Sequence, residues 1–292
     1  MSRTVDLSGV WIPIITPFRE QHVDHDALAA LVRRLAADGI AGFVVCATTG
    51  EAPLLSDAER LASLATVKAS TTLPLVMGVS ATTADEVLRR IEAAMPYAPA
   101  AFLVTAPPYL RPSQPALRAF FAAIADTAPA PLVLYDIPAR TGVRLEPGTL
   151  LELAAHPNIV AIKDCGGRVE QTERLIADGR LQVLCGNDDE WFSTRCLGGA
   201  GAIAASAHIR TDLFVAFDRS LARGDLVSAR ALWRQLKPLA TALFGEPSPG
   251  PVKALLAAGG ECANELRAPM TTTSPALTAR LRALVDGLPV RV

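Results

Sequence analysis

The chain has 292 residues, 50% of them apolar and 20% charged, and its net charge at pH 7 is −1. This balance, without any block of like charge, gives no bulk attraction to nucleic acid or to an acidic membrane surface. The five cysteines form no C-x-x-C pair, and no His cluster has metal-ligand spacing. We therefore expect reduced thiols, no metal site and a cytoplasmic protein. No signal peptide and no long uncharged apolar run is recognisable, so we expect no membrane span.

Eight short apolar runs recur along the chain, with amphipathic stretches between them. The runs are rich in Val, Ile and Leu and do not alternate with polar residues, which is typical of strands buried on both faces. We predict strands at residues 10–15, 42–47, 73–79, 101–106, 131–137, 159–165, 181–187 and 201–206.

The intervening stretches have apolar residues at helical spacing. The stretch 56–70 opens with Ser56 and has Glu59 three residues later, a capping box, and the stretch 24–39 ends in Asp-Gly, a C-terminal cap signal. The remaining predicted helices are 83–95, 112–127 and 146–156 and, in the C-terminal part, 211–225, 226–244, 251–260 and 273–288.

Alternating strands and helices predict a parallel α/β sheet. Eight such units predict a closed (β/α)8 TIM barrel, with additional C-terminal helices packed outside it. We expect residues 1–208 to form the barrel core and residues 209–292 to form the final barrel helix and a helical extension. The alternative is a doubly wound open sheet, which the lack of a G-x-G-x-x-G after the first strand disfavours.

Polar side chains collect where the predicted strands end, and Lys163 is the most informative of them. Only four of the 28 basic residues are lysines, and Lys163 ends the apolar run Ile159–Ile162. Catalytic groups of a barrel lie at the carboxyl ends of its strands. Burial lowers the pKa of an amine, so we expect a neutral Lys163 that can attack a carbonyl carbon and form a Schiff base. The alternative is an ion pair with Asp164 or with another acid at the rim, and alternation along the strand disfavours Asp164.

Two further strand ends carry groups suited to the same chemistry. Tyr135 ends the preceding strand, where a phenol could move protons or orient the amine, or could be a core tyrosine. Arg140 follows in a loop, where its guanidinium could bind a carboxylate or form a surface ion pair. Thr48 and Thr49 precede a glycine and a helix, where hydroxyls and backbone N–H groups could hold a small anion, or form an ordinary turn.

Together these segments resemble the dihydrodipicolinate synthase family within the pyruvate-dependent class I aldolases and lyases, the N-acetylneuraminate lyase superfamily. The resemblance covers nearly the whole chain in order. The matching motifs are "PIITPF" (13–18), "TTGE" (48–51), "YDIPARTG" (135–142), "AIKDCGG" (161–167) and "GGAGAIAAS" (198–206).

The resemblance implies a set of catalytic residues. Lys163 would form the Schiff base with the keto carbon of pyruvate, and Tyr135 would be the phenol that transfers protons. Thr48 would hydrogen-bond Tyr135 and link it to Tyr109. In the family the tyrosine at the position of Tyr109 reaches into the neighbouring subunit's site, so a homodimer or homotetramer is implied.

The resemblance also implies binding residues and an activity. Thr49 would hold the pyruvate carboxylate, and Gly186 and Ile203 would line the pocket. Arg140 would receive the carboxylate of aspartate semialdehyde, an arginine that the sialic-acid lyases usually lack. The implied reaction condenses pyruvate with aspartate semialdehyde in lysine and diaminopimelate biosynthesis, through a covalent imine at Lys163 and without cofactor or metal.

Several positions depart from the family pattern. Asp136 and His208 stand where Asn is usual, Ala47 where Gly is usual, and Ser248 where Asn is common. These departures keep open an alternative, another pyruvate-dependent aldolase or dehydratase that acts on a 2-keto-3-deoxy sugar acid or another aldehyde. A carboxylate-binding sensor without catalysis is a third hypothesis, which the intact lysine and tyrosine disfavour.

Feedback inhibition by lysine is expected to be weak or absent. At the positions where lysine-inhibited relatives carry His, His, Asn and Tyr, this chain has Asp57, Arg60, Thr82 and Pro108. Only Glu86 fits the pattern of those relatives. Millimolar lysine that strongly reduced the rate would contradict this expectation.

Overall fold

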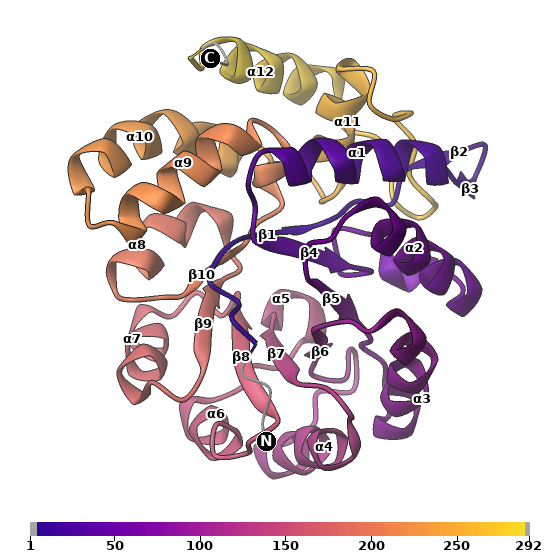
Figure 1. The fold of residues 1–292 in the computed structure, drawn as a ribbon, viewed down its shortest axis with the longest axis vertical. Helices are drawn as coiled ribbons and strands as arrows, with labels where there is room; N and C mark the ends of the chain where they lie inside the picture. Colours follow the sequence, from indigo (N-terminus) through magenta and orange to yellow (C-terminus); the bar gives the residue numbers. More distant parts are fainter. Residues whose placement is uncertain (1–4, 290–292) are drawn as a thin grey trace. The chain divides into compact units, whose positions relative to one another are not determined.

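The computed structural model describes residues 5–289 of the chain. Eight strands correspond to the predicted runs: β1 (Gly9–Pro13), β4 (Gly42–Val45), β5 (Leu75–Gly78), β6 (Ala101–Thr105), β7 (Leu132–Asp136), β8 (Ile159–Asp164), β9 (Gln182–Cys185) and β10 (Gly201–Ile203). They form a closed barrel of parallel strands in the order β1-β10-β9-β8-β7-β6-β5-β4, which confirms the predicted (β/α)8 class (Figure 1). The open-sheet alternative is wrong, because a closed barrel has no edge strand.

Seven of the eight barrel strands lie inside the predicted apolar runs, and β1 begins one residue before its run, at Gly9; each strand is shorter than its run. The residues of β4, β5 and β7 are all buried, as expected for strands that are covered on both faces. Some run residues beyond the strands still bond to the neighbouring strand, as the Ile14 N–H does to the Val44 carbonyl at 3.0 Å and the Val79 N–H to the Leu103 carbonyl at 3.1 Å.

The chain divides into two compact units, each of which is described by itself. The first contains the described part of Met1–Ser8 together with Pro74–Ile203, and the second contains Gly9–Leu73 and Ala204–Val292 up to residue 289. Both units combine strands with helices. The division expected from the sequence is a different one, at residue 208, between a barrel core and a helical extension. That division stays a prediction.

The first unit holds strands β5 to β10. Its helices are α3 (Ala84–Ala94), η2 (Met95–Tyr97), α4 (Gln114–Thr127), α5 (Pro138–Thr141), α6 (Pro147–Leu153), α7 (Val169–Asp178), η3 (Asp188–Glu190) and α8 (Trp191–Cys196). Successive long helices pack on one another, α3 on α4, α4 on α6 and α6 on α7, as Figure 1 shows. This arrangement leaves the carboxyl ends of the strands to the short elements α5, η3 and α8.

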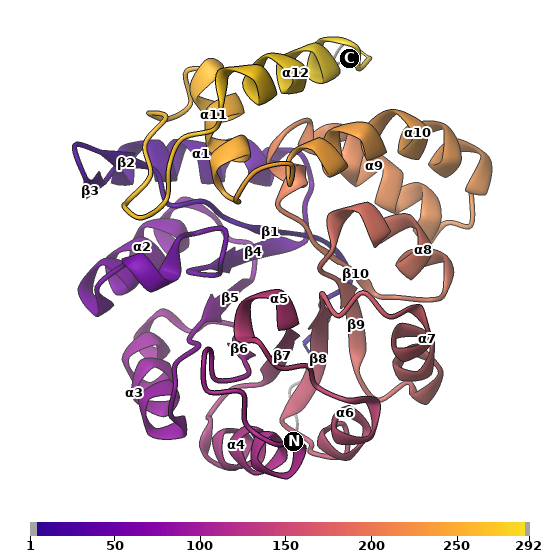
Figure 2. The same ribbon diagram turned by 180° about the vertical axis from the view of Figure 1, so that it is seen from behind.

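The second unit holds β1, β4 and a small antiparallel hairpin, β2 (Phe18–Arg19) with β3 (His22–Val23). Its helices are α1 (His25–Ala37), η1 (Ala52–Leu54), α2 (Asp57–Ser70), η4 (Ser206–His208), α9 (Thr211–Ala222), α10 (Leu226–Ala242), α11 (Gly250–Ala258) and α12 (Pro275–Asp286). Helix α9 packs on α10, and α12 packs on both α10 and α11 (Figure 2). The predicted C-terminal helices are therefore confirmed.

The predicted helix caps are present. The Ser56 hydroxyl accepts from the Glu59 N–H at 3.2 Å, and the Glu59 carboxylate accepts from the Ser56 N–H at 2.9 Å, which completes the capping box of α2. Helix α1 ends at Ala37, Asp38 is its C-terminal cap, and Gly39 follows with a φ of 82°. Of the helices in the described residues, none is long and apolar enough to cross a membrane.

Candidate active site

Lys163 lies on β8 directly beside Tyr135 of β7. Parallel pairing of the two strands puts Tyr135 and Lys163 at matching positions. Both side chains are buried, with 3% and 4% of their surface exposed. The Lys163 Nζ lies 4.5 Å from the centre of the Tyr135 ring. The predicted amine and phenol are therefore brought together where their strands end.

Asp164 faces away from this pair, as alternation along the strand predicts. Its Oδ1 accepts from the Gly166 N–H at 2.8 Å, and its Oδ2 accepts from the Thr172 hydroxyl at 2.7 Å. The Asp164 carboxylate is thus hydrogen-bonded to the turn after β8 and to α7. The alternative in which Lys163 is simply paired with Asp164 is wrong.

The charge of Lys163 differs from the sequence-based expectation. Burial lowers the pKa of the Lys163 amine, but the electrostatic influence of Tyr135, Cys165 and Asp188 and a hydrogen bond to Tyr135 outweigh it, so the net pKa is raised. The expectation of a neutral amine at rest is therefore wrong. It considered desolvation alone and could not include charges that the fold brings close. The resting side chain is an ammonium, so a proton must leave before an imine can form.

Gly186 belongs to this site because its backbone lies against the lysine side chain. A Cβ at Gly186 would lie 3.0 Å from the Lys163 Cε and 2.3 Å from the Cys165 Sγ. Ile203 is 2% exposed and ends β10, which pairs with β9 through Ala202 and Cys185. Gly186 follows β9, so Ile203 is at the neighbouring strand end.

Arg140 and Tyr109 lie on exposed parts of the first unit. Arg140 is on the short helix α5, and its side chain is exposed. Tyr109 follows β6, has a φ of 71° and is 92% exposed. The two loops touch, because a Cβ at Gly142 would lie 3.2 Å from the Arg111 Cγ. Within one subunit Tyr109 is therefore not packed against protein, and its predicted role in a neighbouring subunit stays a prediction.

Thr48 and Thr49 lie in the second unit, in the turn after β4. The N–H groups of Gly50 and Glu51 donate to the carbonyls of Ala47 and Thr48 at 3.1 and 3.0 Å. These two N–H groups are therefore used within the turn, and anion binding would fall to the threonines themselves. Thr49 is 6% exposed, so its side chain points into the protein.

His208 has a structural place, although its position departs from the family pattern. It is fully buried, its Nδ1 donates to the Ala205 carbonyl at 2.8 Å, and its Nε2 accepts from the Ile15 N–H at 3.2 Å. Burial lowers the pKa of His208 to about 4, so the ring is neutral at pH 7. With both ring nitrogens occupied, His208 has no group left for a substrate.

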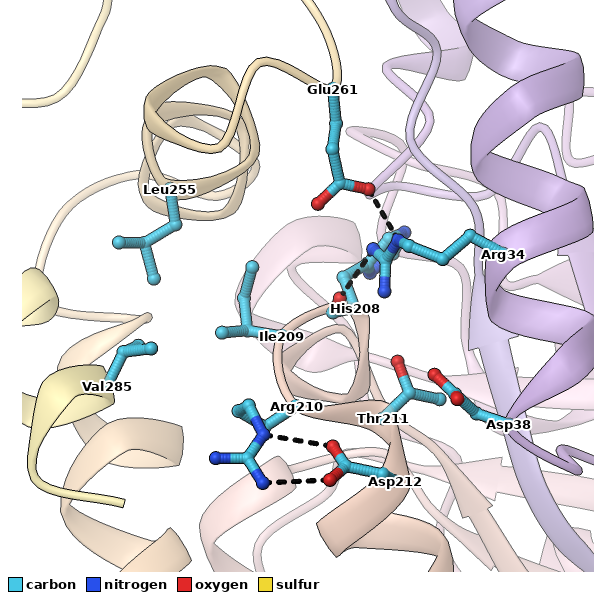
Figure 3. A pocket seen from close by; sticks show the side chains of 10 residues that line it. All are labelled: Arg34, Asp38, His208, Ile209, Arg210, Thr211, Asp212, Leu255, Glu261 and Val285. Atoms are coloured by element: carbon cyan, nitrogen blue, oxygen red, sulfur yellow. Dashed lines mark hydrogen bonds and ion pairs between the residues drawn. The ribbon is translucent and has the colours of Figure 1, made fainter. Parts of the chain in front are cut away.

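His208 also borders a pocket of about 330 Å³ in the second unit, shown in Figure 3. Two ion pairs lie on its wall, Arg34 with Glu261 at 2.5 Å and Arg210 with Asp212 at 2.8 Å. None of the ten lining residues is a predicted site residue. In the part of the chain that the structure describes, no group of three or more His, Cys, Asp or Glu side chains could hold a metal ion.

Two residues near the predicted site, Cys165 and Asp188, were not singled out from the sequence, and Asp136 was noted only as a departure from the family pattern. Cys165 and Asp188 act on the charge of Lys163, and Asp136 is a buried carboxyl next to Tyr135. Burial raises the pKa of Cys165 to about 12. Cys165 and Asp188 lie in the strand-end segments "KDC" and "CGNDD", so strand-end position was the available signal.

Comparison with known proteins gives one consistent result. Residues 6–287 match the sequence profile described as "Dihydrodipicolinate synthetase family". A 4-hydroxy-tetrahydrodipicolinate synthase from Hyphomonas neptunium is 40% identical over 276 residues, 92% of this chain and 94% of that protein. One from Thermomicrobium roseum is 35% identical over 287 residues, 97% of this chain and 95% of that protein.

A solved structure extends the match to three dimensions. The chloride-inhibited dihydrodipicolinate synthase from Acinetobacter baumannii, complexed with pyruvate, is 31% identical to this chain and superimposes with a TM-score of 0.93. The match covers 96% of this chain and 98% of that one. With family profile, relatives and fold in agreement over nearly every residue, the chain belongs to the dihydrodipicolinate synthetase family.

Proposed function

We propose that the chain is a 4-hydroxy-tetrahydrodipicolinate synthase, which condenses pyruvate with aspartate semialdehyde through an imine at Lys163. The observation that carries the proposal is the buried Lys163 Nζ, 4.5 Å from the centre of the Tyr135 ring. The names of the relatives from Hyphomonas neptunium and Thermomicrobium roseum support the same activity.

The first half of the reaction forms the nucleophile. Lys163 loses a proton, Tyr135 being the adjacent group that can relay it, and the free amine attacks the keto carbon of pyruvate. Water leaves, and a C–N double bond remains. Loss of a proton from the pyruvate methyl group then gives an enamine. Thr49 is assigned to the pyruvate carboxylate, and Thr48 to the proton relay.

The second half joins the substrates and releases the enzyme. The enamine carbon attacks the aldehyde carbon, a C–C bond forms, and the aldehyde oxygen takes a proton. The amino group of aspartate semialdehyde then replaces Lys163 at the imine carbon and closes the ring. Arg140 is assigned to the carboxylate of this second substrate, because its exposed guanidinium can bind two oxygens at once. The overall change releases one water and needs no metal or cofactor.

The departure at His208 does not favour a second function. Both of its ring nitrogens are already bonded inside the protein. Release of pyruvate from keto-deoxy sugar acids is therefore kept as an outcome of the test. The cytoplasm, and an assembly of at least two subunits, belong to the same proposal.

Borohydride trapping tests the chemistry first. Protein incubated with pyruvate and reduced should gain the mass of pyruvate less one water and plus two hydrogens, on the peptide that contains Lys163. Lys163→Arg should gain nothing, because a guanidinium does not form the imine. A mass gain on another lysine would contradict the assignment.

A panel of aldehydes then tests the substrate. Aspartate semialdehyde should be turned over with pyruvate, and the product should cyclise. Trapping of pyruvate without turnover of this aldehyde, together with pyruvate release from a keto-deoxy sugar acid, would overturn the synthase and support the alternative aldolase.

A further inference from the structure

The far end of the loop that carries Arg140 is hydrogen-bonded to Asp136, at the end of the strand from which the loop starts. Asp136 is the last residue of β7, and only 1% of its surface is exposed. Its Oδ1 accepts a hydrogen bond from the Leu145 N–H at 3.0 Å. This bond joins the two ends of the loop 137–144, so the loop is closed into a ring on the end of a buried strand.

Other contacts hold the returning end of this loop. The Arg144 Nη1 donates to the Gly166 carbonyl at 2.5 Å, and the Thr141 hydroxyl donates to the Val143 carbonyl at 2.7 Å. For the Arg140 guanidinium itself, no hydrogen bond or ion pair is found among residues 5–289. The direction in which Arg140 points therefore depends on the backbone of the loop, and the backbone depends on its anchors.

Asp136 is surrounded by groups that make its charge costly. A Cβ at Gly166 would lie 2.9 Å from the Asp136 Oδ2, 2.9 Å from the Asp164 Oδ1 and 2.8 Å from the Arg144 Nη1. Asp164 faces it from β8, Arg144 faces it from the returning loop, and the neutral Gln171 faces it from α7. Burial first, and the nearby Asp164, raise the pKa of Asp136 to about 6.

The hydrogen bond between Asp136 and Gln171 is the weaker of the two hydrogen bonds of the Asp136 carboxyl group. The Gln171 Nε2 donates to the Asp136 Oδ2 at 3.4 Å, which is long for a hydrogen bond. The Gln171 Oε1 is buried without a hydrogen-bond partner among the described residues. The strong contact of Asp136 is therefore the one to Leu145, which is the contact that closes the loop.

We propose that Asp136 is a positioning residue, which clamps the Leu145 N–H and so presents Arg140 to the carboxylate of the second substrate, most firmly when Asp136 is ionised. The inference rests on the proposed function, because it deepens the role assigned there to Arg140. A hydrogen bond to an ionised acceptor is about twice as strong as one between neutral groups. Protonation of Asp136 therefore loosens the clamp without breaking it.

The consequence is specific to one substrate. As the pH falls through about 6, the KM for aspartate semialdehyde should rise, because Arg140 is held less well. The KM for pyruvate and its trapping at Lys163 should not follow that change, because the clamp closes the Arg140 loop and not the segment that holds Lys163. A residue that merely stabilised the fold would affect both substrates alike.

Two variants of the full chain, Asp136→Asn and Asp136→Ala, test the proposal. The control is Gly148→Ala on α6, because a Cβ at Gly148 would meet nothing within 4 Å. Asp136→Asn keeps an oxygen for the Leu145 N–H but does not titrate. It should keep the KM for aspartate semialdehyde within about threefold at pH 7.5 and should flatten its rise between pH 7 and 5.5. Asp136→Ala removes the clamp and should raise that KM about five- to tenfold, with the pyruvate KM unchanged.

Three outcomes would overturn the inference. One is an Asp136→Asn protein with the pH profile of the unmodified protein. Another is an Asp136→Ala protein with an unchanged KM for the aldehyde, or with both KM values raised equally. If Asp136→Ala does not fold, the pH dependence of the KM for aspartate semialdehyde in Asp136→Asn alone tests the inference. If the unmodified protein traps pyruvate but turns over no aldehyde that bears a carboxylate, the proposed function fails, and this inference fails with it.

Discussion

At the scale of one residue, the site has no room for a side chain at position 186. A Cβ there would approach the Cys165 Sγ to 2.3 Å and the Lys163 Cε to 3.0 Å. Non-bonded atoms do not come that close, so Lys163 or the turn after β9 would have to move.

We therefore predict that Gly186→Ala lowers the rate of pyruvate trapping at Lys163 by at least about tenfold, because the amine is displaced from its position over Tyr135. Borohydride trapping followed over time measures this. The matched control is Gly148→Ala, which should trap pyruvate at the normal rate. Equal trapping rates in the two variants would show that the amine does not depend on the space at Gly186.

His208 makes a prediction about acid stability. Its pKa is about 4 in the folded protein, against an ordinary value of 6.5, so the unfolded chain binds more protons between these values. Stability from His208 is present above pH 6.5 and is lost as the pH falls toward 4. Protonation would also turn the Nε2 into a donor that faces the Ile15 N–H donor.

The free energy of unfolding should accordingly fall more steeply in the unmodified protein than in His208→Asn between pH 6.5 and 4. The difference should reach about 3 kcal/mol at the acid end. Urea unfolding at several pH values measures it. His22→Asn, at an exposed histidine, should follow the unmodified protein, and parallel curves for all three would contradict the assigned cause.

At the scale of elements, α11 is joined to the turn after β4 by a buried ion pair. The Lys253 Nζ lies 2.5 Å from the Glu51 Oε1, and the two side chains are 0% and 1% exposed. Glu51 also accepts from the Arg267 N–H at 3.2 Å, and Lys253 lies over the Phe18 ring at 4.2 Å. Glu51 directly follows Thr48-Thr49-Gly50 and has a φ of 52°, so the C-terminal helices support the turn that carries both threonines.

Removal of one partner of a buried pair leaves the other charge without compensation, which typically costs about 3–5 kcal/mol. We predict a loss of this size for Lys253→Met, measured by urea unfolding. Glu51→Gln in addition should recover part of the loss, because the isolated carboxylate is then gone. Lys237→Met on the exposed face of α10 is the control. A Lys253→Met protein as stable as this control would contradict the prediction.

The elements themselves were mostly predictable, for reasons that particular cases make clear. The run 159–165 became β8 because its apolar residues require burial on both faces, wherever the strand lies in the barrel. The hairpin of β2 and β3 was missed, since each strand has two residues and carries no detectable period. Helix α5 was also missed, because its four residues, Pro138–Thr141, are shorter than the pattern that identifies a helix.

At the scale of the whole molecule, the 92% exposed Tyr109 and its 57% exposed neighbour Leu110 leave an apolar surface beside the Arg140 loop. An assembly in which Tyr109 completes the site of a second subunit would cover it. Such a two-fold arrangement exchanges the same residue in both directions.

Mixed dimers test this arrangement. Lys163→Ala and Tyr109→Phe should each have low activity, and refolding them together should restore about a quarter of full activity, because half of the dimers are mixed and each has one complete site. Lys163→Ala mixed with Tyr135→Phe is the control, since these defects disable both sites of every mixed dimer. Isolated mixed dimers without recovered activity would show that Tyr109 does not act across the interface.

The amino-acid sequence by itself determined the eight strands, their order, the C-terminal helices and the placing of Lys163 and Tyr135 at strand ends. These follow from apolar period, caps and turn residues, which are local. Only the tertiary structure decided that Lys163 is an ammonium at rest, that Asp136 closes the Arg140 loop, and that Lys253 is paired with Glu51. Charge and positioning depend on contacts between different elements, such as the pair of Lys253 and Glu51, which are 202 residues apart, and only the packing of the folded chain sets these contacts.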